Sequence, residues 1–227
     1  MSLLTISSPF GSGGKEIAQI VADGLNLEIY DDRKLLELAP EAGIRPEDLK
    51  DLRRPGFLDR IFSNKPQVYL EYMDSIIFEV SRQGNGVIIG HGSQMLLQDF
   101  GCALHVRIQA AEEIGVDSTR YAAGLIIEAA NAEEIHACSL TALEAMEKFS
   151  LVKKVQAALL KDNLDDNLLT VDVSETGVIE LGGLTHSQEL LDRIIEVVHK
   201  VPGVSKVHSE IVIATSLYAG SLNRTRS

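Results

Sequence analysis

The chain has 227 residues, of which 45% are hydrophobic, and a formal net charge of −12. Its length allows one large or two smaller domains with a substantial core. The negative charge argues against nucleic-acid binding and against attraction to anionic lipids, so any phosphate site must be local. The sequence has neither an apolar run of membrane-spanning length nor a secretion signal. We therefore expect no stable membrane insertion and a cytoplasmic location.

A glycine-rich segment follows the apolar run Leu3 to Ser7 and precedes a helical pattern, Glu16 to Leu25. A strand, a glycine-rich turn and a helix N-terminus together form a cradle for phosphate. Glycines let backbone N–H groups approach an anion, and a lysine adds a mobile positive charge. The residues predicted to bind nucleotide phosphate are Gly11, Ser12, Gly13, Gly14 and Lys15, with Lys15 also the catalytic candidate.

The loop departs from the full P-loop pattern at two positions. Pro9 stands where that pattern has a glycine, and Glu16 stands where it has Ser or Thr. Without that hydroxyl, Mg²⁺ would lose its usual ligand in the loop, so we expect ATP as a ligand more than we expect Mg²⁺. No residue is assigned as a metal ligand. The alternative is that the glycines only form a tight turn between strand and helix.

Short apolar runs alternate with helical patterns as far as about Ala130, which predicts an α/β domain with a parallel sheet and flanking helices. The strand expected at Gly86 to Gly90 is apolar and β-branched, as a strand covered on both faces should be. Its end marks the sheet edge at which α/β proteins bind ligands, so the next residue, His91, is a second candidate. The other expected strands are Leu3 to Ser7, Leu27 to Tyr30 and Leu104 to Ile108.

Cys102 and Cys138 are the two cysteines, and they lie in ordinary apolar or helical surroundings. Their separation does not match a metal site or a redox motif. We therefore expect two buried free thiols and no disulfide.

The pattern changes near Ser150. We expect a P-loop domain over residues 1–132, a helical connector over 133–150, a second domain over 151–214 and a flexible tail over 215–227. The second domain is predicted to be small and α+β, with the order helix, strand, strand, helix, strand (αββαβ). Its expected strands are Leu169 to Ser174, Val178 to Leu181 and Val207 to Ala214, and the segment Thr185 to Gln188 has the spacing of a capping box.

The N-terminal half resembles the cytidylate kinase-like proteins of bacteria, which are P-loop enzymes related to nucleoside monophosphate kinases. The segments that carry the resemblance are 4–7, 10–18, 29–31, 57–62, 86–92 and 104–108. The resemblance implies ATP at the glycine loop, a nucleoside monophosphate nearby and transfer of the terminal phosphoryl group. On the acceptor side it implies Arg60, His91 and Arg107.

Three features of the resembling family are missing. Ser8-Pro9 and His91 stand where the family usually has arginines, and the arginine-bearing lid expected after Ile108 is absent. Phosphoryl transfer depends on positioning and on neutralising charge, so these losses favour nucleotide binding over efficient catalysis. For His91, the alternative to a phosphate ligand is a neutral histidine hydrogen-bonded to backbone.

The C-terminal unit resembles a BON domain through Gly177 to Gly183, the helix from Ser187, and Val201 to Val207. This resemblance implies contact with a small ligand or a protein partner, whereas the acidic residues of the unit disfavour anionic membranes. Three hypotheses follow: a regulatory nucleotide-binding protein with weak or no phosphoryl transfer, an active nucleoside monophosphate kinase, and a non-catalytic interaction scaffold. In the first, helices within Glu133 to Phe149 link the two domains. A homo-oligomer is compatible with each.

Overall fold

The computed structural model describes residues 3–9, 11–45, 47–49, 64–109, 116–132, 138–164 and 168–214. The N-terminal part contains a four-stranded parallel sheet in the order β2-β3-β1-β4. Its strands are β1 (Leu3–Ser7), β2 (Glu28–Tyr30), β3 (Gly86–Ile89) and β4 (Ala103–Arg107). Each expected strand is confirmed to within a residue at either end.

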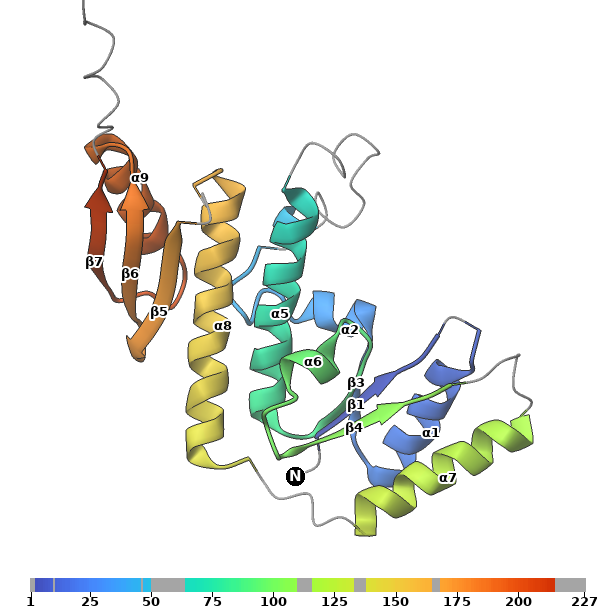
Figure 1. Ribbon diagram of the computed structural model, residues 1–227. Helices are drawn as coiled ribbons and strands as arrows, with labels where there is room; N and C mark the ends of the chain where they lie inside the picture. The colour runs from blue at the N-terminus through green and yellow to red at the C-terminus, as the bar shows by residue number, and fades with distance from the viewer. Residues whose placement is uncertain are drawn as a thin grey trace, which may run out of the picture.

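Helices cover both faces of this sheet (Figure 1). Leu4 and Ile6 of β1 point to the face covered by α1 (Gly14–Leu25) and α7 (Val116–Ala132), where they share a core with Val21. The intervening Leu3 points to the opposite face, into a second core built mainly on α5 (Lys65–Gln83). Two shorter helices follow strands: α2 (Asp32–Glu37) comes after β2, and α6 (Ser93–Leu96) lies between β3 and β4 in the chain. The alternating burial along β1 follows from the period of two in a strand.

The longest helix, α8 (Leu140–Lys161), connects the two halves of the molecule. Met146 and Ala157 belong to the core shared with α5, whereas Leu151 and Val155 belong to the core of the second sheet. In Figure 1, α8 lies between α5 and that sheet. The position near Ser150, where we expected the connector to end, is inside this continuous helix.

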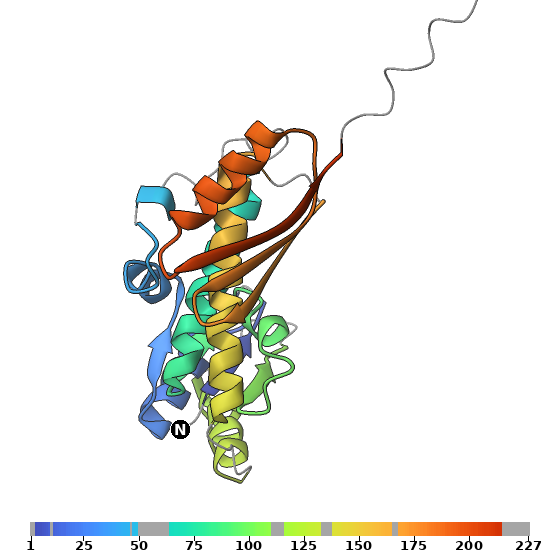
Figure 2. The same ribbon diagram turned by 90° about the vertical axis from the view of Figure 1, so that its left-hand side faces the viewer.

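The C-terminal unit has the predicted order of helix, strand, strand, helix and strand. Its sheet has the order β5-β6-β7, with β5 and β6 antiparallel and β6 and β7 parallel. Figure 2 shows α8 and α9 on the same side of this sheet. The elements after α8 are β5 (Leu169–Glu175), β6 (Val178–Thr185), α9 (Gln188–His199) and β7 (Lys206–Ile213).

Two local expectations for this unit are corrected. Strand β6 continues beyond the expected end at Leu181, because Gly182 and Gly183 still pair in register with β5. The partner strand approaches closely there, since a Cβ on Gly182 would lie 2.6 Å from Thr170 Oγ1. The cap of α9 is Ser187, whose hydroxyl accepts a hydrogen bond from the Leu190 N–H at 3.2 Å. The expected capping box at Thr185 is therefore wrong.

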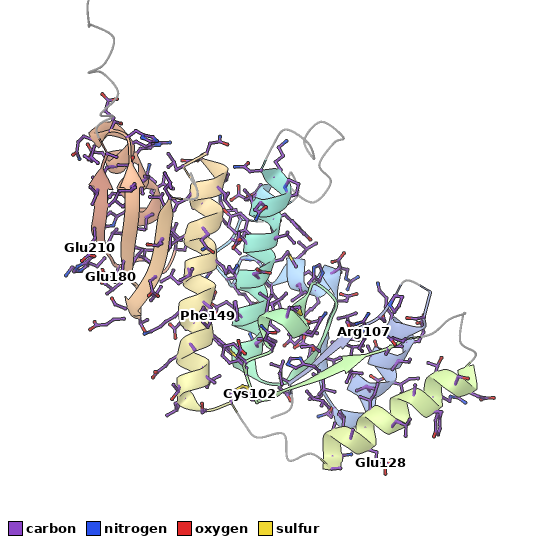
Figure 3. The ribbon with its side chains drawn as sticks, viewed as in Figure 1. Cys102, Arg107, Glu128, Phe149, Glu180 and Glu210 are labelled. Atoms are coloured by element: carbon purple, nitrogen blue, oxygen red, sulfur yellow. A yellow bond between two sulfur atoms is a disulfide. The ribbon has the colours of Figure 1, made fainter. Side chains whose placement is uncertain are left out.

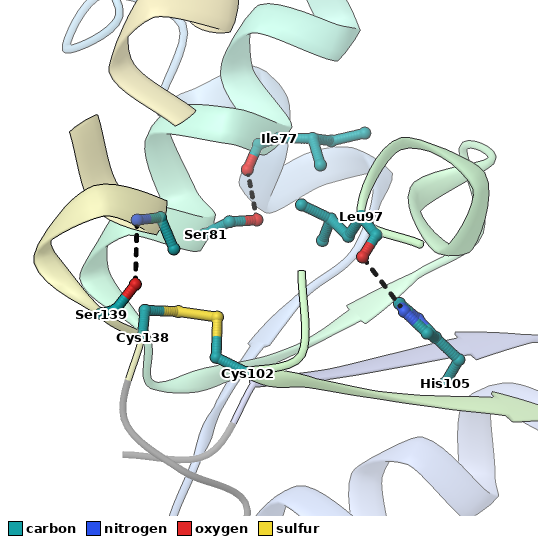
Figure 4. The surroundings of a disulfide bond; sticks show 8 residues. Ile77, Ser81, Leu97, Cys102, His105, Cys138 and Ser139 are labelled. Carbon is teal, nitrogen blue, oxygen red and sulfur yellow. Dashed lines mark hydrogen bonds between the residues drawn. A yellow bond between two sulfur atoms is a disulfide. The ribbon is translucent and has the colours of Figure 1, made fainter. Parts of the chain in front are cut away.

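The two cysteines form a disulfide, so the prediction of free thiols is wrong (Figure 4). Cys102 directly precedes β4, and Cys138 directly precedes Ser139, which caps α8 by accepting a hydrogen bond from the Ala142 N–H. The disulfide therefore links the start of β4 to the start of α8. Disulfides are typical of oxidising compartments, and the cytoplasmic location stays a prediction.

Candidate functional site

The glycine-rich loop joins the central strand β1 to the first turn of α1. Gly11 and Gly13 have φ angles of 82° and 68°, in the left-handed region that glycine adopts most readily. Gly13 is the N-cap of α1 and has no side chain to cap the helix. Among the described residues, the backbone N–H groups of Gly14, Lys15 and Glu16 donate no hydrogen bond. A helix N-terminus with free N–H groups attracts anions.

Internal contacts fix the shape of this loop. The Ser12 hydroxyl donates to the Pro9 carbonyl oxygen at 2.7 Å, and the Ser12 N–H donates to the same oxygen at 3.3 Å. Gly14 is buried and packs against Ser8, whose side chain occupies the space that a Cβ on Gly14 would need. The loop is therefore preformed, and the Ser12 hydroxyl is engaged with backbone.

Lys15 and Glu16 begin α1 and are both exposed. In the described part of the chain, the Lys15 ammonium has no carboxylate or carbonyl partner. It is therefore available to a ligand at the helix N-terminus. Glu16 occupies the position where nucleotide-binding loops carry the hydroxyl that holds Mg²⁺, so this loop presents a carboxylate there instead.

The second glycine loop adjoins the first, because the Gly90 N–H donates to the carbonyl oxygen of Ile6 at 3.0 Å. Gly90, His91 and Gly92 all have positive φ angles, of 73°, 54° and 68°. The His91 ring nitrogen Nε2 pairs with the Asp32 carboxylate on α2. The expectation of a backbone partner is wrong. A protonated His91 would thus find its counter-charge within the chain.

A cavity of about 530 Å³ opens beside the first loop. It lies between the end of β1, the end of β4 and α6, and its lining includes Ser8, Pro9, Gln94 and Arg107. Arg107 pairs in register with Ser7 and is exposed at the end of β4, as its label in Figure 3 shows. The Gln94 side-chain oxygen is buried and has no hydrogen-bond partner in the part of the chain that the structure describes. The cavity therefore combines a cation and an unsatisfied polar atom next to the loop.

His105 also lines this cavity and was not among the predicted site residues. Its Nδ1 lies 2.7 Å from Thr5 Oγ1, and its Nε2 lies 3.3 Å from the Leu97 carbonyl oxygen (Figure 4). Since a carbonyl only accepts, the neutral ring carries its proton on Nε2 and the threonine hydroxyl donates to Nδ1. The sequence signal was the polar residue Thr5 within an apolar strand, and the structure places His105 opposite it in register.

The structure thus brings Arg107 to the cavity beside the glycine loop and places His91 on a neighbouring loop with its own carboxylate partner. Arg60 lies outside the described residues. Among the residues that are described, no group of three or more His, Cys, Asp or Glu side chains is arranged to hold a metal ion. The arrangement can bind an anion by backbone N–H groups, Lys15 and Arg107.

Residues 3–158 match the model of the cytidylate kinase-like family, which spans more than half of the chain. The chain belongs to the cytidylate kinase-like family. Residues 148–215 match the BON domain. The two matches overlap within α8, the helix that contributes to both hydrophobic cores.

No curated protein matches this cytidylate kinase-like chain. A solved structure of an uncharacterized protein from Eubacterium ventriosum ATCC 27560 is similar at 16% identity, covering 93% of this chain and 89% of that one, with a TM-score of 0.35. That score is too low to assign a shared fold. In the described part of the chain, no helix has both the length and the apolar character needed to cross a membrane.

Proposed function

We propose that the cytidylate kinase-like domain binds the phosphates of a nucleotide of the ATP or CMP type at Gly11–Lys15. The observation that carries the proposal is that, among the described residues, the N–H groups of Gly14, Lys15 and Glu16 donate no hydrogen bond and the nearby Lys15 ammonium has no partner. Such an arrangement stabilises an anion through the helix dipole and direct hydrogen bonds. The cavity lined by Arg107 offers space for the rest of the ligand.

The same loop supports binding better than it supports catalysis. The Ser12 hydroxyl is engaged with Pro9, and Glu16 replaces the hydroxyl residue, so Mg²⁺ would depend on phosphate and water ligands. His91 stands where the family usually has an arginine, and it pairs with Asp32. We therefore propose weak or no phosphoryl transfer, and a regulatory role in which nucleotide binding is coupled through α8 to ligand or protein contact by the BON domain.

A calorimetric titration of the full-length protein with ATP, CTP and CMP, with and without Mg²⁺, tests this proposal. The same samples are assayed for nucleoside diphosphate. We expect saturable binding without rapid turnover. Turnover would instead favour an active nucleoside monophosphate kinase, and the absence of both binding and turnover would favour an interaction scaffold.

The variant Lys15→Ala tests the loop itself. Loss of a hydrogen bond between charged groups should weaken ATP binding by about tenfold or more. Lys206→Ala is the matched control, because Lys206 is exposed on β7 in the BON domain. Equal affinities for the two variants would contradict phosphate binding by the glycine loop.

A further inference from the structure

A second cavity, of about 460 Å³, lies where the two domains meet. Its wall comes from Gly43, Ile44, Arg45 and Asp48, from Tyr72 on α5, from the last turns of α8 and from the end of α9 with Pro202. The two domains are in close contact here: Gly43 has a φ of 76°, and a Cβ on it would lie 2.9 Å from Pro202 Cβ. The cavity shares no lining residue with the one beside the glycine loop.

The polar groups of this cavity include an unused donor. Tyr72 is only 8% exposed, and its hydroxyl has no hydrogen-bond partner among the described residues. Burial, together with the nearby Asp48 carboxylate, raises the pKa of Tyr72 to about 12, so the hydroxyl keeps its proton at neutral pH. Within the described part of the chain, this hydroxyl is therefore available to donate a hydrogen bond to a ligand in the cavity.

Cations outnumber carboxylates along the lining. Asp48 is shared by two of them: Arg45 contacts both of its oxygens at 3.1 and 3.2 Å, and Lys161 contacts it at 2.8 Å. The other lining carboxylate, Asp162, pairs with Arg193 at 3.2 Å. The other two lining cations, Lys154 and Lys200, pair with Glu79 and Glu196 outside the lining. The excess positive charge therefore comes from Arg45 and Lys161, which share the single carboxylate of Asp48. In a chain of net charge −12, this local balance favours an anion over a cation.

Another part of the wall is apolar. It is formed by Ile44, Ala158, Val197, Val201 and Pro202. The volume lies within the range of about 300–1,000 Å³ that is usual for small-molecule sites, which combine apolar walls with a few polar groups that orient the ligand. A bare inorganic ion would leave this apolar wall unused.

We propose that this interdomain cavity binds a small organic anion, whose acidic group meets Tyr72, Arg45 and Lys161 and whose apolar body lies against Val197 and Val201. The site is separate from the proposed nucleotide loop and does not depend on it. Because its wall comes from both domains, occupancy stabilises their contact and raises the temperature of unfolding.

The experiment titrates the full-length protein with phenyl phosphate, and separately with inorganic phosphate and with neutral benzyl alcohol. We expect saturable binding of one phenyl phosphate and at least tenfold weaker binding of the other two. Tyr72→Phe should weaken phenyl phosphate binding by about tenfold, because it deletes one hydrogen bond to a charged acceptor. Tyr121→Phe, which removes a phenol that is exposed on α7, is the matched control and should leave the affinity unchanged.

Three results would overturn the proposal: no saturation by phenyl phosphate, equal binding of benzyl alcohol or inorganic phosphate, or no effect of Tyr72→Phe. Retention of phenyl phosphate binding in Lys15→Ala separates this site from the glycine loop, and loss of binding there would also overturn the proposal. Should Tyr72→Phe fail to fold, Lys161→Gln on the lining is compared with Lys206→Gln on β7. A weaker affinity only in Lys161→Gln is then the expected result, and equal affinities would contradict the site.

Discussion

Ser75 on α5 and Ser150 on α8 face each other with their hydroxyl oxygens 3.0 Å apart, and both side chains are fully buried. The Ser150 hydroxyl donates to Glu79 Oε1 at 2.9 Å, so its one proton is used there and Ser75 must be the donor between the two serines. Lys154 approaches the same carboxylate oxygen at 3.3 Å. A directed series of hydrogen bonds therefore crosses the contact between α5 and α8.

Replacing Ser150 with alanine should destabilise the protein by about 1–3 kcal/mol, since Glu79 loses a buried donor and Ser75 loses its acceptor. Ser75→Ala leaves the contact from Ser150 to Glu79 intact, so we expect a smaller loss. Urea unfolding of the two variants and the wild type measures both effects. A loss in Ser75→Ala as large as that in Ser150→Ala would contradict the direction of the series.

Glu79 should make stability depend on pH in the acid range. Burial by itself would raise its pKa, but Lys154, Ser150 and Arg82 together hold the pKa below the ordinary value of 4.5. The unfolded chain therefore binds the proton more readily, so the contribution of Glu79 is present above pH 4.5 and is lost as the pH falls through the lower folded pKa. In urea unfolding between pH 3 and 7, the free energy of unfolding should fall less steeply toward acid pH in Glu79→Gln than in the wild type.

Asp74, on the same helix, is the control, because its pKa is shifted in the opposite direction. Burial raises its pKa above the ordinary value of 3.8, although Lys153 lies 3.2 Å away and opposes that shift, as does the charge of His91. Its contribution is therefore present below pH 3.8 and is lost as the pH rises through the folded pKa. In Asp74→Asn, the free energy of unfolding should therefore fall more steeply toward acid pH than in the wild type. If both variants changed the pH dependence of stability in the same direction, the opposite pKa shifts assigned to Glu79 and Asp74 would be contradicted.

The disulfide between Cys102 and Cys138 should stabilise the folded chain by restricting the unfolded chain. Its residues are 36 apart in sequence, and a loop of this size corresponds to about 3–4 kcal/mol in the chain-entropy treatment. Adding dithiothreitol should lower the unfolding temperature of the wild type and leave Cys138→Ser unchanged. Titration of two free thiols in the denatured, unreduced protein would show that the bond does not form.

The sequence predicted the sheet well because its strands are short apolar runs with clear limits. Leu3–Ser7 and Gly86–Ile89 are flanked by glycine or polar residues, and both were located correctly. It could not predict that α8 runs through position 150, because the apolar residues of this helix divide between two faces, one packed on α5 and the other on the second sheet, and do not form a single stripe. The disulfide was missed for a related reason: only the tertiary fold brings Cys102 next to Cys138.

For the candidate site, the sequence could predict features encoded in a local pattern but could not predict contacts between distant residues. The glycine loop could be recognised because strand, turn and helix are contiguous from Leu3 to Leu25. The pairing of His91 with Asp32 could not be predicted, since the two residues lie in different segments that follow different strands of the sheet. His105 was missed because its partners, Thr5 and Leu97, lie on other elements.

The pairing of His91 with Asp32 gives a test of whether lost charge limits catalysis. His91→Arg alone should change CMP affinity and turnover little, because Asp32 neutralises the new charge as it does that of a protonated histidine. The double variant His91→Arg/Asp32→Asn leaves the guanidinium without that partner, so we expect tighter CMP binding and, if the chain is a decayed kinase, faster nucleoside diphosphate formation. Asp32→Asn alone is the control. If the double variant binds CMP no better than the single variants, His91 has a structural role and the acceptor phosphate does not approach this loop.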